Sequence, residues 1–437
     1  METSDKTKIT AAKALVLSAG GSPGAYDIVR ALGLAEIPSL VASSQRNDIA
    51  FYSRYCRGRL VLPPFEDAYD RDILQTLLSY AARLDGRPVL FYASDAELSF
   101  VWRHREALLP SYRFLLPPNG LLECIFNKAS FVDFAADQNL PTPASWHVRN
   151  PRDLSRALAS ITFPCIVKPA FSQDWIWDTD EQREQFGPYK KALRRFASAG
   201  DLMDFCRALP ERSAGFVIQS YIDGRDEVIT SFHGYFDEQS RCLGYFVGRK
   251  VRTYPPHTGG STYIQTVDEP ALAVSSIRML TQIGFQGVVK IDYKWDNQEK
   301  KYQILEINPR YNLWEVLGAY AGVNLVALAY DHQRGALVHP RAGLAREARL
   351  LYLKQDLRAF VTGYRLTGEW SWWSYVKSLV RRKQYFRVFD LHDPSPFLHS
   401  VISFFKRNLR VGMIQRSQVQ ERDINCRVVS NPLQHES

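Results

Sequence analysis

The sequence predicts a chain of mixed α/β and α+β character with a helical C-terminal extension. Over residues 1–118, short apolar runs alternate with helix-like segments, a pattern typical of a doubly wound sheet. From about residue 125, strand-like runs follow one another more closely, which favours antiparallel pairing. After about residue 345, helical periodicity and aromatic residues dominate. We therefore expect more than one folded part.

The first segment reads as a βαβ unit. An apolar run at 14–18 precedes a glycine-rich turn at 20–24, a helix-like stretch at 25–34 and a strand-like stretch at 37–43. A further strand is predicted at 88–92. The turn resembles a phosphate-binding turn, but a plain strand-to-helix turn explains it equally well, because the Gly-x-Gly-x-x-Gly spacing is absent. The chain has no P-loop pattern either.

The 437 residues exceed what one hydrophobic core usually serves. We predict an α/β domain at 1–118, a second domain at 119–335 with a hinge near 219–224, and a basic, aromatic-rich helical extension at 336–437. In the second domain we expect two helices, several strands and one long loop. The helices are predicted at 131–138 and 271–283, the loop at 171–185, and the strands at 163–169, 216–219, 227–233, 245–251, 287–293 and 302–307.

Composition narrows the class of protein. The net charge of +9 suits anionic partners such as nucleotides, but is not by itself a nucleic-acid signal, and we expect no nucleic-acid partner. The six cysteines are scattered without metal-ligand spacing, as in a reduced cytoplasmic protein. The polar N-terminus has no apolar signal core, and no apolar stretch approaches the length needed to cross a bilayer.

Two predicted strands carry the strongest chemical pattern. Alternation along a strand places Lys290 and Asp292 on one face, and likewise Glu306 and Asn308. If the two strands pair, their oxygen-bearing side chains converge, and such hard ligands suit Mg²⁺. The alternative is a set of solvent-facing residues on half-buried strands. The Pro-Arg pair that ends at Arg310 directly follows the second strand and favours the metal site.

Upstream residues suggest a nucleotide site, although each alone has an ordinary explanation. Lys128 follows an apolar stretch, and Lys168 ends a buried strand before a proline. Isolated lysines are more often solvated than ligand-bound. The strand at 216–219 breaks at Gly224, which could expose backbone groups to an adenine edge, with Glu227 placed for a ribose hydroxyl. A plain turn with an exposed acid is the alternative interpretation.

Taken in order, these segments resemble the ATP-grasp superfamily over roughly residues 10–335. Within it, the chain is most similar to the carboxylate–amine ligase group that includes D-aspartate ligase. Three segments carry that similarity: residues 91–95, residues 249–256 with the Gly-Gly-Ser turn at 259–261, and residues 389–396. The resemblance implies an ATP-grasp fold in which a pre-grasp domain precedes two α+β subdomains that clasp ATP.

The resemblance also implies nucleotide contacts. Lys128 and Lys168 would hold the α- and β-phosphates, and Glu227 the ribose. Lys250 or Arg252 would contact the γ-phosphate. The adenine would lie against backbone groups of four hinge residues, namely Gln219, Ser220, Tyr221 and Ile222. Ser220 stands where the family usually has a glutamate, so one side-chain contact differs.

By the same resemblance, Asp292, Glu306 and Asn308 would ligate two Mg²⁺ ions, with Mn²⁺ as a substitute. Arg310 would stabilise the acyl-phosphate or the substrate carboxylate. Lys290 occupies a position where related ligases often place an arginine, and we assign it with Arg252 and Arg310 to the catalytic set.

The implied reaction is ADP-forming. The γ-phosphoryl group of ATP would pass to a carboxylate, and an amine would displace phosphate to form an amide. The acid would be an amino acid, a sugar acid or a cell-envelope precursor. The alternative is an ATP-binding regulatory protein without ligase turnover. Lids are expected at 259–261 and 171–185, and His257 stays outside the catalytic set because a structural histidine is an equal explanation.

The C-terminal extension is basic and aromatic. Between residues 376 and 410 the sequence has eight basic residues and only two acidic ones, and three tryptophans precede this stretch. Such a segment can lie on an anionic membrane, which would place a cytoplasmic protein at the inner face. A helical extension packed on the ligase body is the alternative that we favour from sequence alone. The resemblance also suggests a homodimer.

Overall fold

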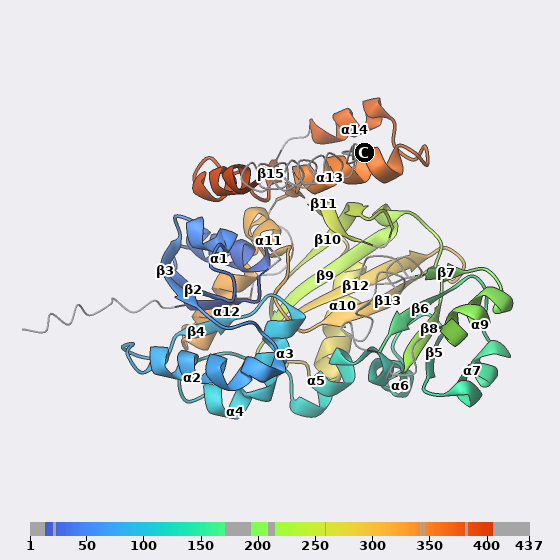
Figure 1. Ribbon diagram of the computed structural model, residues 1–437, viewed down its shortest axis with the longest axis horizontal. Coiled ribbons are helices and arrows are strands. Elements are labelled where there is room, and N and C mark those ends of the chain that lie inside the picture. Colours follow the sequence, from blue (N-terminus) through green and yellow to red (C-terminus); the bar gives the residue numbers. More distant parts are fainter. Residues whose placement is uncertain are drawn as a thin grey trace, which may run out of the picture.

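The computed structural model of the chain describes residues 14–20, 23–170, 194–208, 215–257, 259–340, 343, 346–380 and 383–404. These residues form three sheets, with a layer of helices from the C-terminal region above the largest sheet (Figure 1). The predicted loop at 171–185 lies outside the described residues. In the described part of the chain, no helix combines the length and apolarity needed to cross a bilayer.

The N-terminal sheet is parallel and has the order β3-β2-β1-β4. This confirms the predicted doubly wound domain, including its strands at 14–18, 37–43 and 88–92. Its strands are β1 (Ala14–Ser18), β2 (Ser39–Ser43), β3 (Cys56–Val61) and β4 (Val89–Phe91), and its helices are α1 (Gly24–Leu34), α2 (Asp70–Ala81), α3 (Asp95–Arg103) and α4 (Arg105–Leu108). The sequence analysis missed β3, an edge strand with exposed arginines.

The second sheet is antiparallel, in the order β5-β8-β6-β7. A separate apolar core that includes Val167, Phe205 and Ile218 fills the space between this sheet and its helices. The strands are β5 (Ser145–Val148), β6 (Cys165–Pro169), β7 (Arg194–Phe196) and β8 (Phe216–Ser220), and the helices nearby are α5 (Asn119–Phe126), α6 (Lys128–Asp137), α7 (Pro151–Leu158) and α9 (Ala199–Ala208).

The third sheet has seven strands in the order β13-β12-β9-β10-β11-β14-β15 and is antiparallel except for its last pair. Its strands are β9 (Ile229–Phe236), β10 (Cys242–Tyr254), β11 (Gly260–Thr266), β12 (Gly287–Asp296), β13 (Lys301–Asn308), β14 (Arg349–Leu351) and β15 (Gln384–Phe386). The accompanying helices are α10 (Pro270–Gln282), α11 (Glu315–Ala321) and α12 (Leu325–Gln333).

The C-terminal region is helical, as predicted, but it also completes the third sheet. Its helices are α13 (Leu353–Ala359), which continues as a π-helical turn (Phe360–Tyr364), and α14 (Trp372–Leu379). The helical periodicity expected after about residue 345 does not hold at residues 350 and 351. Leu350 and Leu351 belong to β14, where they are buried and pair with β11.

Polar contacts fasten the C-terminal region to the N-terminal domain. The Arg30 guanidinium on α1 lies 2.7 Å from the Asp390 carboxylate, and Arg30 itself is buried. Asp393 accepts hydrogen bonds from the Ser53 hydroxyl at 2.6 Å and the Arg54 amide at 2.8 Å. The segment 389–396, which the sequence analysis linked to the ligase group, therefore connects the two ends of the fold.

A second polar contact holds the helical layer on the large sheet. Arg252 of β10 and Asp356 of α13 are both fully buried, with Arg252 Nη2 2.8 Å from Asp356 Oδ2. Arg252 also donates to the Ser378 hydroxyl at 3.0 Å and lies over the ring of Trp370. A buried charge without its partner is costly, so this pair ties α13 firmly to the sheet.

We predict that Asp356→Ala lowers the free energy of unfolding by about 3–5 kcal/mol, because it leaves the Arg252 charge buried without a partner. Urea unfolding followed by circular dichroism measures the change. Asp204→Ala, which breaks an exposed pair with Arg207, is the control and should cost less than ~1 kcal/mol. Equal losses in the two variants would contradict this role of the buried pair.

Candidate active site

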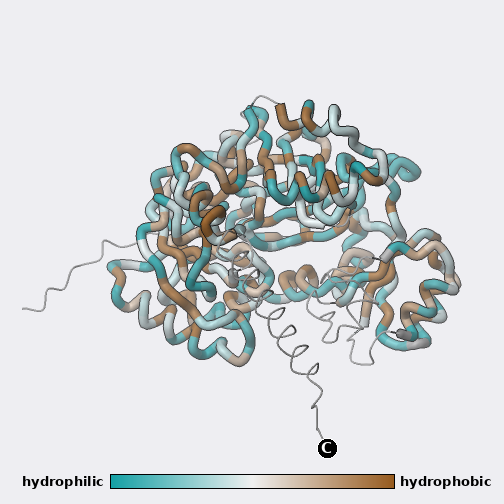
Figure 2. The backbone as a smooth tube through the Cα atoms, turned by 45° about the horizontal axis from the view of Figure 1, so that its top comes forward, coloured by the Kyte–Doolittle hydropathy of each residue, from teal (hydrophilic) through white to brown (hydrophobic). Residues whose placement is uncertain are grey.

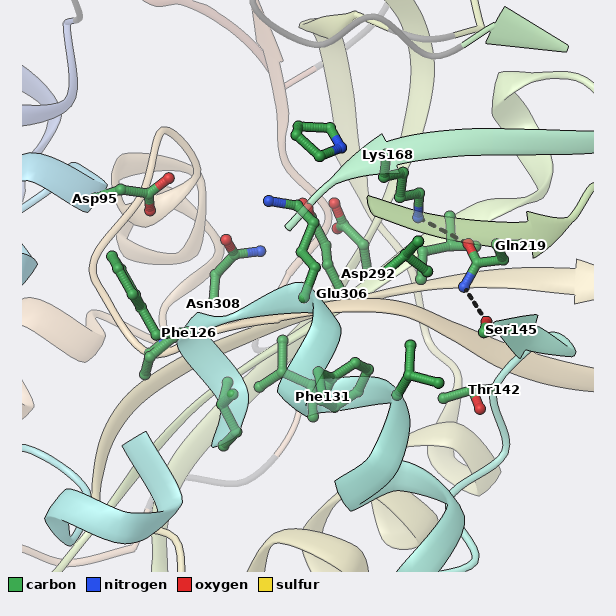
Figure 3. A pocket seen from close by; sticks show the side chains of 18 of the residues that line it. Asp95, Phe126, Phe131, Thr142, Ser145, Lys168, Gln219, Asp292, Glu306 and Asn308 are labelled. Carbon is green, nitrogen blue, oxygen red and sulfur yellow. Dashed lines mark hydrogen bonds between the residues drawn. The ribbon is translucent and has the colours of Figure 1, made fainter. Parts of the chain in front are cut away.

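A cavity of about 410 Å³ is lined by the second and third sheets and by helices that include α3 of the N-terminal domain, and the close-up view shows side chains from these two sheets around it (Figure 3). Its volume is typical of a small-molecule site. Eight of the residues that the sequence analysis singled out line it: Lys128, Lys168, Gln219, Lys250, Asp292, Glu306, Asn308 and Arg310. The sequence pattern and the cavity therefore point to the same place.

The register of β12 and β13 builds the centre of this cavity. Asp292 stands opposite Glu306, and Lys290 stands opposite Asn308. The strands pair as the sequence argument requires, and the side chains of Asp292, Glu306 and Asn308 lie next to one another (Figure 3). Two carboxylates and an amide are therefore brought together on one face of the sheet.

Asp292 is buried and charge-compensated. It accepts hydrogen bonds from Lys290 Nζ at 2.9 Å, from Lys250 Nζ at 3.4 Å and from the Ser231 hydroxyl. Burial opposes its ionisation, but Lys250 and Lys290 outweigh burial and hold the pKa of this carboxyl well below its usual value. Asp292 is therefore a permanent anion at neutral pH.

The two lysines differ in their protonation equilibria. Burial alone would lower the pKa of each ammonium, since the charged form loses hydration. Asp292 and Glu306 raise the pKa of Lys250 above its ordinary value, whereas burial leaves the pKa of Lys290 below it. Lys290 Nζ also lies 5.5 Å from the centre of the Trp314 ring, beneath the strand. Lys250 lines the cavity, but Lys290 is not among its lining residues.

The second sheet contributes a polar chain to the opposite wall. Lys168 Nζ on β6 donates to Gln219 Oε1 on β8 at 2.7 Å, and Gln219 Nε2 donates to the Ser145 hydroxyl on β5 at 3.0 Å (Figure 3). Lys128 is the first residue of α6, which Asn127 caps through the amides of the first turn. Lys128 and Lys168 therefore reach the cavity from two different elements.

The remaining hinge residues lie outside the set that lines the cavity. The Ser220 hydroxyl is 3.3 Å from that of Thr162, and Ile222 is buried. Tyr221 is sandwiched by charges, with the Arg195 guanidinium 4.7 Å and Lys294 Nζ 4.9 Å from its ring centre. Adenine contact through the hinge backbone stays a prediction from the resemblance.

Glu227 also lies outside the cavity lining. It belongs to a short 3₁₀ turn, Asp226–Val228, and is half-buried there. Burial raises the pKa of its carboxyl. The predicted ribose contact therefore stays a prediction.

The assignment of Arg252 to the catalytic set was wrong. Its guanidinium is fully buried against Asp356 and is absent from the cavity lining. The reason is local: the pairing of β10 with β11 shifts register between Lys250 and Arg252 and again before Thr253. Such bulges re-aim side chains, so the alternation that would place Lys250 and Arg252 on one face does not hold.

Arg310 joins the third sheet to the N-terminal domain. Its Nε donates to Asp95 Oδ1 at 2.5 Å and its Nη1 to the Ala93 carbonyl at 3.3 Å. A longer contact of 3.5 Å links Nη2 to the Asn308 amide oxygen. Asp95 lines the cavity as the first residue of α3, which Ser94 and Glu97 cap. In the sequence, Asp95 stands out only within the segment 91–95 that resembles the ligase group, and its place in the site was not predicted.

His257 and Thr253 line the cavity beside the Gly-Gly-Ser turn. His257 Nε2 lies 2.8 Å from Glu369 Oε1, and Asp226 accepts a hydrogen bond from the Thr253 hydroxyl at 3.1 Å. Tyr364 also donates to Asp226. Glu369 and Tyr364 belong to the C-terminal region, so residues more than 100 positions away support this wall.

Solved structures share the fold of this chain. N5-carboxyaminoimidazole synthetase from Staphylococcus aureus aligns with a TM-score of 0.58 at 14% identity, over 83% of this chain and 88% of that one. The biotin carboxylase domain of 2-oxoglutarate carboxylase from Hydrogenobacter thermophilus, a dimer in complex with MgADP, aligns with a TM-score of 0.56 at 12% identity, over 77% and 73%. The chain has an ATP-grasp fold. The fold predicted from the resemblance is thereby confirmed.

Sequence comparison agrees with the ATP-grasp assignment. The chain is 23% identical over 282 residues to D-aspartate ligase from Enterococcus faecium (strain Aus0004). The match covers 61% of this chain and 63% of that relative, so it spans less than two thirds of the relative's length. No family model matches the sequence.

The ATP-grasp cavity offers oxygen ligands for a metal ion. Among the described residues, no group of three or more His, Cys, Asp and Glu side chains is arranged to hold one. The expected set has only two acids, Asp292 and Glu306, with the Asn308 amide as the third oxygen donor. Such a set suits Mg²⁺, which keeps waters and substrate phosphates as its other ligands. The donors present therefore fit the ion that the resemblance implies.

A buried acid lies beneath the site at the start of α11. Glu315 Oε1 accepts hydrogen bonds from the Asn312 amide at 3.2 Å and from Asn312 Nδ2 at 2.8 Å. Its Oε2 is buried without a hydrogen-bond partner among the described residues. Burial raises the pKa of this carboxyl to about 8. Glu315 is therefore protonated in the folded protein at neutral pH.

We predict that Glu315→Gln changes how stability depends on pH. The Glu315 carboxyl has a higher pKa in the folded protein than in the unfolded chain, so it ionises first in the unfolded chain as the pH rises. The stability that protonated Glu315 contributes is therefore present at pH 4 and is lost as the pH rises towards 8. Glutamine does not ionise, so the variant does not lose stability in this way. The free energy of unfolding of the variant minus that of wild type should therefore rise by more than ~1 kcal/mol between pH 5 and pH 8. Urea unfolding at both pH values measures the difference. A constant difference would contradict the raised pKa.

Proposed function

We propose that the protein is an ATP- and Mg²⁺-dependent carboxylate–amine ligase that releases ADP and forms an amide bond through an acyl-phosphate. One observation carries the proposal: the β12–β13 register gathers Asp292, Glu306 and Asn308 in a cavity that is also lined by four cationic side chains, Lys128, Lys168, Lys250 and Arg310. The similarity to D-aspartate ligase supports this class of reaction. The MgADP complex of the structurally similar biotin carboxylase domain supports the choice of nucleotide and metal.

The nucleotide would lie between the second and third sheets. Lys128 and Lys168 would bind its α- and β-phosphates, and Lys250 would reach the γ-phosphate, since all three line the cavity. Lys168 is already oriented by its hydrogen bond to Gln219, so little side-chain freedom is lost on binding. The hinge backbone at 219–222 would hold adenine.

Asp292, Glu306 and Asn308 would hold two Mg²⁺ ions, or Mn²⁺ in their place. Bound metal neutralises phosphate charge as the phosphoryl group moves. Lys250 and Lys290 compensate the negative charge of Asp292. Lys250, which lines the cavity beside Asp292, would also be placed to contact the phosphates.

Arg310 would recognise the acid substrate. A guanidinium presents a planar set of donors that matches a carboxylate, and Asp95 fixes its orientation through Nε. The carboxylate would then lie between the N-terminal domain and the third sheet. Its class is an amino acid, a sugar acid or a cell-envelope precursor, and the second partner is a small amine. Arg310 would also stabilise the charge of the acyl-phosphate.

The ligase is proposed to work in the cytoplasm on small molecules and without nucleic acid. A homodimer stays a prediction from the resemblance. Contact with a membrane, which the sequence analysis weighed against a helical extension packed on the ligase body, concerns a surface apart from the cavity and is proposed on separate grounds.

We predict that Glu306→Gln reduces ADP release by on the order of 100-fold or more, because the substitution removes a charged metal ligand at the reacting phosphate. A coupled assay over pairs of acids and amines, with ATP and Mg²⁺, measures the rate. Glu299→Gln is the matched control, since Glu299 lies on the exposed β12–β13 turn beside Lys301. It should keep the wild-type rate.

Two outcomes would overturn the proposal. Full activity of the Glu306→Gln variant would exclude the metal assignment. Tight ATP binding by the wild-type protein without turnover, across a broad panel of acids and amines, would instead favour the regulatory ATP-binding protein.

A further inference from the structure

Exposed apolar side chains concentrate in the C-terminal region. Of the 20 large hydrophobic residues that are exposed in the described chain, 14 lie between residues 353 and 404. Trp373 is 77% exposed, Val380 78% and Leu391 80%. Scattered exposed apolar residues are ordinary, but contiguous ones mark interaction sites. This part of the surface therefore differs from the rest of the protein.

The exposed residues follow the helical repeat. Leu353, Leu357 and Val361 recur every four positions along α13 and its π-helical continuation. On α14, the exposed apolar residues are Trp372, Trp373, Val376 and, at its end, Val380. Spacings of three and four place side chains on one side of a helix. Each helix thus buries one side on the protein and leaves an apolar stripe outside.

These helices form one layer. Rings of Phe360 and Trp372 lie 4.8 Å apart, which joins α13 to α14. Lys354 Nζ lies 4.6 Å from the Phe404 ring, which joins α13 to the end of the described chain. Figure 1 shows α13 and α14 together on the upper side of the molecule, above β10 and β11, and Figure 2 shows hydrophobic segments along this layer. We call the exposed side chains of residues 353–404 the C-terminal face.

The acids of this region all point inward. Asp356 pairs with Arg252, and Glu369 contacts His257. The other two acids of residues 353–404 are Asp390, which pairs with Arg30, and Asp393, which binds Ser53 and Arg54. Each of the four carboxylates therefore has a partner inside the protein.

Basic residues, in contrast, point outward. The exposed ones in the described part of residues 353–404 are Lys354, Arg358, Arg365, Lys377 and Lys383. Arg365 lies over the ring of exposed Trp372, with 5.5 Å between its guanidinium and the ring centre. The C-terminal face therefore combines apolar stripes, tryptophans and positive charge, without an outward carboxylate to balance them.

We propose that the C-terminal face binds the surface of an anionic lipid bilayer. Apolar stripes would enter the headgroup boundary, the tryptophans would lie at the interface, and the lysines and arginines would meet lipid phosphates. A second copy of the chain fits less well, because a two-fold contact would set the same cations against one another. The protein would lie on the membrane without crossing it.

The test is cosedimentation of the full-length protein with vesicles at ~150 mM salt, near physiological ionic strength. Binding is expected to vesicles that contain phosphatidylglycerol and to be at least tenfold weaker to pure phosphatidylcholine. Raising the salt should weaken binding to the anionic vesicles, since screening acts on exposed charges. Vesicle binding needs no ATP turnover, so the result is independent of the proposed ligase activity.

Matched variants locate the binding surface. Trp373→Glu and Lys377→Glu should each reduce binding to anionic vesicles at least tenfold. Val274→Glu, at a 56% exposed position on α10, introduces the same charge elsewhere and should bind as wild type. Circular dichroism and thermal melting verify that each variant is folded.

Three results would overturn the proposal. The first is the absence of wild-type protein from sedimented anionic vesicles. The second is an equal loss of binding in Trp373→Glu and Val274→Glu. The third is light scattering that shows a dimer which Trp373→Glu dissociates, with no vesicle binding, since the C-terminal face would then be a subunit interface.

Discussion

The antiparallel pairing of β12 with β13 is the constraint on which the site depends. Since side chains alternate along both strands, one register sets Asp292 beside Glu306 and Lys290 beside Asn308. A slip of one residue would turn these groups to the other face. The register also places a buried carboxylate where it must be compensated, and Lys250 and Lys290 provide that charge. The Asp292 carboxylate thus contributes both to stability, through its pairs with the two lysines, and to the capacity to bind a cation.

The cavity is lined by the second and third sheets and by α3 of the N-terminal domain, and long-range contacts hold its walls. Arg310 connects the third sheet to α3 through Asp95, and the Lys168–Gln219 bond orders the second sheet. On another side, Glu369 from the C-terminal region holds His257. Because these contacts come from distant parts of the chain, the cavity is complete only when the whole molecule is folded.

The sequence predicted those parts of the site that follow from local periodicity. A period of two placed Asp292 on one face of its strand and Glu306 with Asn308 on one face of another, and the structure pairs these two strands. The resemblance misplaced Arg252, because its direction is set by a bulge in the pairing of β10 with β11, which the sequence of β10 alone does not show. Helical periodicity failed at β14, because a three-residue strand is defined by its neighbours. The contact of His257 with Glu369 spans 112 positions, and no local pattern signals it.

The contact between Arg30 and Asp390 has a consequence for folding during synthesis on the ribosome. The two residues are 360 positions apart, and at a synthesis rate of ~5–20 residues per second the first waits on the order of half a minute for the second. During that time α1 carries a guanidinium whose partner has not been made, and the third sheet lacks β14 and β15 until the last ~50 residues before Asp390 are synthesised. The nascent chain therefore emerges with one edge of its largest sheet open, a stage at which ribosome-associated chaperones would protect it from pairing with neighbouring chains.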